Sequence, residues 1–285
     1  MDRFDRVYFA VKNRTKYLKS TMKMLFDKSQ IKCLKKNKKF ENMYYGKRCF
    51  IIGNGPSLRT QDLSLLQDEY VFTVNYFTKS EQYLMVKSNF HILMDPAIFD
   101  FSTEYREERL KPLLAINTYD NKPLCFTQYI EKAVIEKEGL NQKLNVFYLN
   151  CGTAMYEQYK RKFDLTKVVP GFSNVILYAT MIAMYMGFKK IYYIGCDMTG
   201  YEQIAIKIGK QVDLHVYKMS DQEKRMLRDQ NRNMDAEEFF EGFFHMFEQY
   251  RLLRNYGKIY GIEMYNATQG GILDVLERVD YETLF

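Results

Sequence analysis

The stretch from Arg48 to Asn75 constrains the fold of this chain most, because it predicts a strand, a glycine turn, a helix and a second strand in succession. An apolar run at 48–52 ends at the loop Gly53-Asn54-Gly55-Pro56-Ser57, and after a mixed segment at 59–69 a second apolar run covers 70–75. Such a turn places backbone N–H groups at a helix N-terminus, which favours an anion such as phosphate. The loop therefore predicts a nucleotide site, and a turn that binds nothing is the alternative.

Each residue type in this loop suits that prediction. Gly53 and Gly55 permit positive φ and the close approach of a ligand, and Pro56 fits the first helical turn. Ser57 or Asn54 has a side chain that can cap N–H groups or bond to the ligand.

Apolar strands alternate with helices along the rest of the chain. Strands are predicted at 90–94, 112–116, 145–149, 191–197 and 258–265, and helices at 78–87, 128–138, 173–186 and 236–255. This alternation is typical of an α/β fold with a doubly wound, mostly parallel, Rossmann-like sheet. In such sheets ligands gather at the carboxyl ends of strands, where Asn54, Asn75, Asp95 and Asp197 are expected.

Composition narrows the class of protein further. The chain has 285 residues, of which 47% are hydrophobic, enough for one large domain. No apolar run approaches the ~18 residues of a membrane span, and the N-terminus lacks a signal-peptide pattern, so a cytoplasmic location is expected. The five cysteines are scattered without C-x-x-C spacing, which favours reduced thiols over disulfides or zinc.

Positive charge is concentrated at the N-terminus. Residues 1–48 carry 15 basic and 4 acidic residues, a net of +11, so the total of +7 leaves −4 for the other 237 residues. The excess of basic residues is confined to this segment and the chain has no nucleic-acid-binding motif, so nucleic acid is not the expected partner. We expect a basic helical arm at 1–46, with a linker at 35–42, before the main domain at 47–285.

The arm carries an amphipathic helix at 4–25. Its apolar stripe follows spacings of four and three residues: Phe4, Tyr8, Val11, Thr15, Leu18, Met22 and Leu25. One interpretation is a helix docked on the domain or paired with another subunit in a homo-oligomer. The other is a helix lying on an anionic membrane surface, on the inner face of the cell membrane.

The polar segment at about 200–235 is a candidate mobile lid, and it contains His215 beside Tyr217. The other two histidines, His91 in an apolar strand and His245 on the aromatic helix, are expected to be structural. The aromatic residues of 236–255 are expected in the core.

Several blocks together resemble the bacterial family of 6-hydroxymethylpterin diphosphokinase-like domains, motility-associated factors and capsule-type glycosyltransferases. The N-terminal half is also similar to bacterial CMP-sialic acid sialyltransferases. The blocks are the loop 53–58, Val74-Asn75, Met94-Asp95-Pro96, Gly195-Cys196-Asp197, His215-Val216-Tyr217, Asn266-Ala267-Thr268-Gln269-Gly270-Gly271 and Arg278-Val279-Asp280-Tyr281. They span residues 47–285.

The resemblance implies a sialyltransferase-like enzyme that moves a sugar, most similar to sialic acid, from a CMP donor onto a surface glycan or a lipid-linked acceptor, with no further cofactor. It implies His215 as the base, with Tyr201 and Tyr217 on the leaving phosphate. The donor-binding residues implied are Gly53, Asn54, Gly55, Pro56, Ser57, Asn75, Asp95, Ser173, Asn174, Gly195, Asp197, Asn266 and Thr268.

Metal use separates the possible activities. The chain contains no Asp-x-Asp pair, which favours a metal-independent CMP-linked donor over a diphosphate donor held through Mg²⁺. Two alternatives stay open: an ATP- and Mg²⁺-dependent diphosphokinase-like enzyme with Asp95 and Asp197 as ligands, and a non-catalytic nucleotide-binding scaffold.

Overall fold

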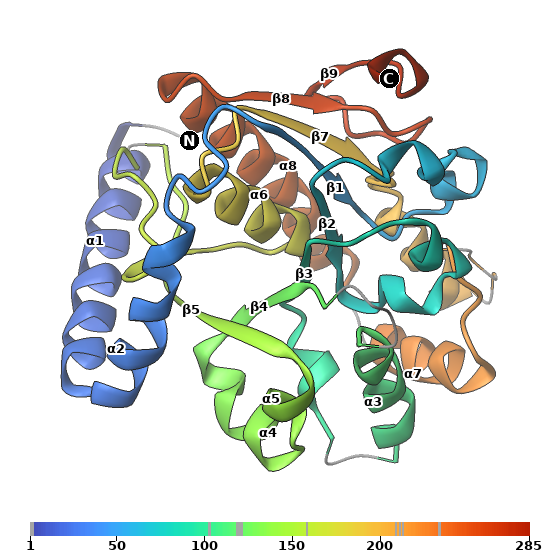
Figure 1. Cartoon of the computed structure of the whole chain (residues 1–285), viewed down its shortest axis with the longest axis horizontal. Coiled ribbons are helices and arrows are strands. Elements are labelled where there is room, and N and C mark those ends of the chain that lie inside the picture. The colour runs from blue at the N-terminus through green and yellow to red at the C-terminus, as the bar shows by residue number, and fades with distance from the viewer. Residues whose placement is uncertain are drawn as a thin grey trace.

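The computed structural model describes residues 3–101, 104–117, 122–157, 159–208, 210, 212, 214–232 and 235–285, without the side chains of 3–10, 207, 208 and 230–232. The described residues form one nine-stranded sheet in the order β6-β5-β4-β3-β2-β1-β7-β8-β9, and each neighbouring pair is parallel. The predicted doubly wound α/β fold is therefore confirmed (Figure 1).

The elements have the following bounds. The strands are β1 (Arg48–Ile52), β2 (Val71–Val74), β3 (Phe90–Leu93), β4 (Leu124–Gln128), β5 (Asn145–Ala154), β6 (Val168–Gly171), β7 (Lys190–Ile194), β8 (Glu263–Asn266) and β9 (Glu277–Arg278). The α-helices are α1 (Arg3–Phe26), α2 (Lys28–Lys35), α3 (Arg106–Ala115), α4 (Lys132–Lys137), α5 (Leu140–Lys143), α6 (Val175–Tyr185), α7 (Asp221–Arg232) and α8 (Ala236–Ile259). The 3₁₀ helices are Lys36–Phe40, Pro56–Thr60, Leu63–Leu66, Asn75–Lys79, Glu81–Met85, Pro96–Phe99, Tyr129–Glu131, Gly200–Ile208 and Glu282–Leu284.

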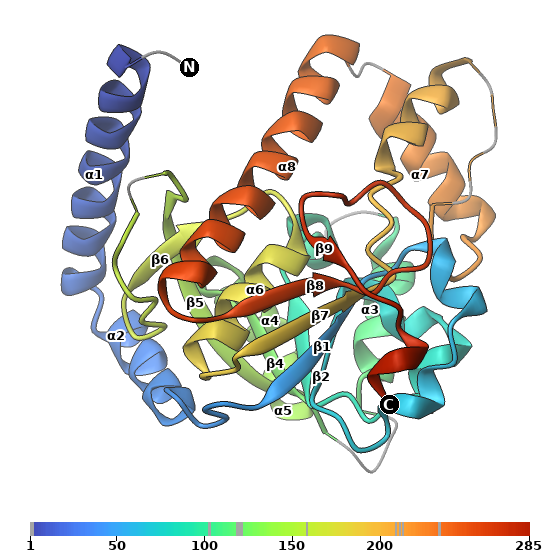
Figure 2. The ribbon, with the colours of Figure 1, turned by 90° about the horizontal axis from the view of Figure 1, so that it is seen from above.

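Both faces of the central strands are buried. In β1, Cys49 and Ile51 belong to a core that includes α6 and part of α8, whereas Phe50 and Ile52 pack on the opposite side with Leu58. Successive strand residues point to opposite faces, so this alternation requires cover on both sides. Figure 2 shows α6 and α8 together on one side of the sheet, which is where the first core lies.

The order of the strands in the sheet departs from their order along the chain at β1. The chain proceeds outward from β1 through β2 to β6, and α6 then carries it back so that β7 lies on the other side of β1. This reversal is a topological switch point, and ligands of such sheets bind at the carboxyl ends of the strands there.

Three sequence-based assignments of local structure are wrong. The run 112–116, predicted as a strand, ends α3, and the helix predicted over 59–69 is two short 3₁₀ helices, Pro56–Thr60 and Leu63–Leu66. Asp62 explains the break between them, because its side chain accepts from Ser64 N–H and starts a new turn. The helix predicted at 78–87 is likewise two 3₁₀ helices, Asn75–Lys79 and Glu81–Met85.

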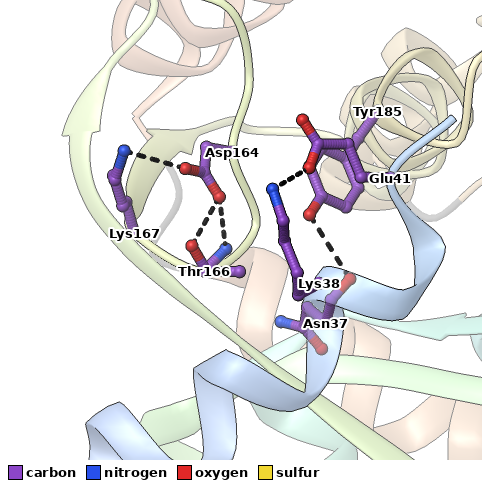
Figure 3. A network of polar contacts seen from close by, with 7 residues as sticks. All are labelled: Asn37, Lys38, Glu41, Asp164, Thr166, Lys167 and Tyr185. Carbon is purple, nitrogen blue, oxygen red and sulfur yellow. Dashed lines mark hydrogen bonds and ion pairs between the residues drawn. The ribbon is translucent and has the colours of Figure 1, made fainter.

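The predicted linker at 35–42 is also wrong, because it is anchored in the protein. Asn37 is fully buried, and its Nδ2 donates to the carbonyls of Tyr148 and Leu165, both at 2.8 Å. Tyr185 donates to the Asn37 carbonyl at 3.3 Å, as Figure 3 shows. Phe40 joins the core, with its ring centroid 5.3 Å from that of Phe126. Residues 35–42 are thus part of the packed structure.

The polar segment at 200–235 is more regular than predicted. It contains the 3₁₀ helix Gly200–Ile208 and α7, and residues 209, 211, 213, 233 and 234 of the predicted lid lie outside the described residues. Glu223 of α7 forms an ion pair with Lys79, which ties the helix to the loop after β2.

Candidate functional site

A cavity of about 270 Å³ opens at the carboxyl ends of β1 and β7, at the switch point. Among its lining residues are the loop after β1, the loop after β7, the start of α6, His215, and one face of α8. The predicted site residues in its lining are Gly53, Asn54, Gly55, Asn174, Gly195, Asp197 and His215.

Three N–H groups of the β1 loop donate to acceptors within the protein. Gly53 N–H donates to the Ile194 carbonyl at 2.8 Å, and Gly55 N–H donates to the Gly195 carbonyl at 2.9 Å. Ser57 donates twice to the Asp197 carboxylate, from its N–H at 3.2 Å and from its hydroxyl at 2.9 Å. The Asp197 carboxylate therefore accepts hydrogen bonds from two of the donors of this loop.

The glycines serve the contact between the two loops. A Cβ on Gly55 would lie 1.6 Å from an Asp197 carboxylate oxygen, and one on Gly53 would lie 2.2 Å from the Gly195 carbonyl oxygen. Gly55 has φ −68°, so positive φ is not the reason for its presence. The close approach predicted for a ligand is made by the β7 loop instead.

Asp197 is almost fully buried at the edge of this cavity. Burial raises the pKa of its carboxyl above the ordinary value, although the hydrogen bonds from Ser57 oppose the rise. The carboxyl is therefore a stronger base than an exposed aspartate, and its two oxygens are held in a fixed orientation.

Two buried polar atoms in the lining have no hydrogen-bond partner among the described residues: Asn54 Oδ1 and Tyr250 Oη. Asn54 Nδ2 donates to the Val74 carbonyl at 3.4 Å, which directs its amide group. An unsatisfied buried polar atom costs about 1–3 kcal/mol, so natural proteins keep few of them without a function. Both atoms belong to residues that line the same cavity.

His215 is positioned through its backbone. Val216 N–H donates to the Asn54 carbonyl at 2.8 Å, and Arg59 donates to the His215 carbonyl at 2.6 Å. The His215 ring stacks on Tyr217, with centroids 4.9 Å apart and planes 14° from parallel. Burial raises the pKa of Tyr217, so its phenol stays neutral under the imidazole.

The remaining predicted residues lie outside the cavity lining. Tyr201 packs its ring 6.1 Å from that of Phe243. Asp95 caps the 3₁₀ helix Pro96–Phe99 through Ala97 N–H at 2.9 Å, and Ser173 bonds to Gln249. Pro56 begins its own 3₁₀ helix. These side chains have local structural roles.

Asn75, Asn266 and Thr268, also predicted to contact the donor, hold the backbone at strand ends. Asn75 has φ 45°, and its side-chain oxygen accepts from Met94 N–H at 3.3 Å. Asn266 is fully buried and donates to the Leu273 carbonyl at 2.7 Å, while Thr268 Oγ1 accepts from Cys196 N–H at 3.0 Å. Thr268 thus helps to shape the β7 loop.

The two other histidines lie away from the cavity. His91 is buried as predicted. Its Nε2–H donates to the Asn75 carbonyl at 2.9 Å, and its Nδ1 accepts from the Thr73 hydroxyl at 2.7 Å. Burial lowers the pKa of His91 to about 4. His245 is exposed on α8, where it contacts Glu248 at 2.9 Å.

The aromatic residues of α8 were predicted to lie in the core, and this is only partly correct. Tyr250 is buried, but Phe240 and Phe244 are exposed, and Phe239 and Phe243 line the cavity together with Met246. The cavity-lining residues recur at 239, 243, 246 and 250, one helical face. The sequence did carry a signal for this arrangement, because the aromatic residues of α8 fall on more than one helical face, whereas a helix that only packs on a core needs one apolar stripe.

No metal centre is evident in the described part of the chain, where no group of three or more His, Cys, Asp and Glu side chains is arranged to hold an ion. Among the described residues that line the cavity, Asp197 is the single acidic residue. Separately, no helix of the described residues is both long and apolar enough to cross a membrane.

Among solved structures, the chain is similar to the MAf glycosyltransferase from Magnetospirillum magneticum AMB-1, at 9% identity and a TM-score of 0.50. The match covers 90% of this chain, which spans 39% of the length of that glycosyltransferase. A second similar structure is the sialyltransferase CstII from Campylobacter jejuni in complex with cytidine-5'-monophosphate, at 16% identity and a TM-score of 0.45, covering 82% of this chain and 85% of that one. The first likeness supports the fold.

The comparison with curated proteins gave no match. The family model described as 6-hydroxymethylpterin diphosphokinase MptE-like matches residues 22–203, which is more than half of the 285 residues. The matched range includes the β1 loop, the start of α6 and the β7 loop that together line the cavity. The chain therefore belongs to the 6-hydroxymethylpterin diphosphokinase MptE-like family.

Proposed function

We propose that this protein is a glycosyltransferase that binds a nucleotide-sugar donor in the cavity between β1 and β7. The observation that carries the proposal is the cavity at the switch point, whose lining joins the loops after β1 and β7 to an aromatic face of α8. The rings of Phe239 and Phe243 provide apolar surface for a nucleobase or sugar. A known glycosyltransferase shares the fold, which supports the same class of reaction.

The donor that we propose is linked through CMP, and its sugar is similar to sialic acid. The described lining residues of the cavity include no lysine or arginine, and Asp197 adds a negative charge when ionised. A diphosphate would bring more negative charge into this environment than a single phosphate, which makes a monophosphate donor the better fit. The absence of an Asp-x-Asp pair from the sequence supports a reaction without a metal.

In the proposed reaction, an acceptor hydroxyl attacks the anomeric carbon and the nucleotide leaves with the bonding electrons on its phosphate. His215, which lines the cavity, takes the hydroxyl proton. Tyr217 stacks beneath the imidazole and fixes its plane, so we assign it a positioning role. The acceptor that we propose is a surface glycan or a lipid-linked sugar, and the polar segment at about 200–235 is the proposed lid.

The family description supports a second candidate, diphosphate transfer from ATP. This reaction would need Mg²⁺ held by acids such as Asp197, and Asp95 as the second predicted ligand caps a 3₁₀ helix outside the described cavity lining. The two candidates differ in one simple measurement, because only diphosphate transfer consumes ATP and is abolished by EDTA.

Calorimetric titration with CMP tests the proposed site. Asn54→Ala removes an unsatisfied acceptor from the cavity and should weaken CMP binding by about 1–3 kcal/mol. Asn150→Ala is the matched control, because Asn150 is also half-buried and its Nδ2 also makes one 3.4 Å hydrogen bond, to Gln30, but on β5. Equal CMP affinity in both folded variants would exclude Asn54 from the site, and a preference for ATP with Mg²⁺ over CMP would favour the diphosphokinase.

A further inference from the structure

Helix α1 lies along one edge of the molecule, beside β5 and β6 (Figures 1 and 2). One face of it is docked: Ser20 Oγ donates to the Gly152 carbonyl at 2.9 Å, and Thr153 Oγ1 donates to the Asn13 carbonyl at 3.2 Å. Met24 is buried in a small cluster with Leu34 and Val168. Gly152 fits closely under the helix, because a Cβ there would lie 2.4 Å from Ser20 Cβ.

The predicted apolar stripe is on the other face of α1 and is exposed to solvent. From residue 11 onward, the exposed apolar residues of this helix are Val11, Leu18, Met22, Leu25 and Phe26. At 100° per residue, Val11 and Leu18 lie about 180° from the docked Ser20. The side chains of Phe4 and Tyr8, also predicted in the stripe, lie outside the described residues. The apolar face of this helix therefore does not pack against the rest of the described structure.

Basic residues separate the exposed stripe from the docked face. Lys16, Lys19 and Lys23 are exposed on one flank of the stripe, and Arg14 is exposed on the other. Residues 11–26 contain no aspartate or glutamate. The outer surface of α1 is therefore an apolar ridge with positive charge along its sides.

We propose that this outer surface of α1 docks on an anionic lipid bilayer. The apolar ridge enters the boundary between headgroups and acyl chains, and the flanking lysines contact the lipid phosphates. A second copy of the chain fits this surface less well, since a symmetric pairing would bring the same lysines together without an acid among residues 11–26 to neutralise them. A nucleic acid would contact the lysines but leave the ridge in water.

The test is co-sedimentation of the full-length protein with vesicles of phosphatidylcholine alone or with about a third of phosphatidylserine. Leu18→Glu places a carboxylate on the ridge. Leu84→Glu is its control, because Leu84 is 59% exposed against 61% for Leu18. Leu84 belongs to the 3₁₀ helix Glu81–Met85, on the far side of the molecule from α1 in Figures 1 and 2. A melting curve of each variant verifies that it is folded.

The native protein should bind the anionic vesicles and not the neutral ones, and its binding should fall as salt rises. Leu18→Glu should lose binding at least tenfold, whereas Leu84→Glu should bind as the native protein does. Lys19→Gln should lower the affinity roughly fivefold, and the exposed Lys87→Gln should not.

Two results would overturn the proposal. In one, the native protein stays in solution with anionic vesicles, or Leu18→Glu and Leu84→Glu bind equally. In the other, light scattering without vesicles finds a native dimer that Leu18→Glu converts to a monomer, which would assign the ridge to a second copy of the chain.

Discussion

At the residue scale, Tyr250 and Tyr193 offer a direct comparison. Both are fully buried, but Tyr250 Oη has no partner among the described residues, whereas Tyr193 Oη lies 2.8 Å from Thr180 Oγ1. Tyr250→Phe removes an unsatisfied hydroxyl, so urea unfolding should show unchanged or slightly higher stability, by up to about 1 kcal/mol. Tyr193→Phe should lose about 1 kcal/mol because Thr180 loses a partner.

The two variants should show the opposite order when their affinity for CMP is measured. Tyr250→Phe should weaken CMP binding, while Tyr193→Phe should leave the affinity unchanged, because its hydroxyl is absent from the described cavity lining. A loss of stability in Tyr250→Phe with no effect on CMP would identify Tyr250 as an ordinary core residue.

His91 predicts how stability depends on pH. Burial lowers its pKa to about 4 in the folded protein, from an ordinary 6.5. The unfolded chain therefore binds the proton first as pH falls, so the stabilising contribution is complete above pH 6.5 and is lost between pH 6.5 and about 4, in total roughly 3 kcal/mol. Urea unfolding at several pH values measures the slope, which His91→Gln should flatten.

The residues of the β1 loop show where sequence reasoning about a site reaches its end. Gly53, Asn54 and Gly55 lie in the cavity lining, but the contact of this loop with Asp197 could not be predicted, because Asp197 is 140 residues further along the chain than Ser57. Nothing in the loop itself reveals that a carboxylate from β7 will occupy its donors. Such long-range pairs become visible only when the strands are placed side by side.

At the scale of the element, α8 combines two environments along one helix. Its second half packs on the sheet, and its first half presents Phe239 and Phe243 to the cavity. Phe243→Ala should weaken CMP binding by about 1–3 kcal/mol if the ring stacks on the nucleobase. Phe244→Ala removes the neighbouring exposed ring and is the control. Equal CMP affinities of the two variants in calorimetry would show that α8 does not contribute to the site.

The periodicity of apolar residues predicted where a helix lies more reliably than it predicted which face of that helix is buried. The period predicted α1 correctly, but its apolar stripe points to solvent, since the docked face uses Asn13, Ser20 and Met24. Periodicity shows that a helix has two faces, while the partner decides which face is buried. The strands that were missed include β4 and β6, and the four residues of β6 end in Pro170 and Gly171, residue types that are depleted in strands.

At the scale of the whole molecule, the alternation of apolar strands and helices was sufficient to predict the doubly wound sheet. A parallel strand buried on both faces has a simple signature, and β1, β3 and β7 carry it. The strand order was not predicted, and therefore the position of β1 between β2 and β7 was not predicted either. That order brings the β1 and β7 loops together and so creates the cavity.

The central claim is that this cavity holds a nucleotide sugar and that His215 takes part in breaking its glycosidic phosphate bond. The most direct measurement is the rate of CMP release from CMP-sialic acid in the presence of EDTA. The native enzyme and His245→Ala should release CMP at the same rate, and His215→Ala should be about 10²–10⁴-fold slower while binding CMP equally well. CMP release that is equal in His215→Ala, or an activity that requires Mg²⁺ and consumes ATP, would contradict this account.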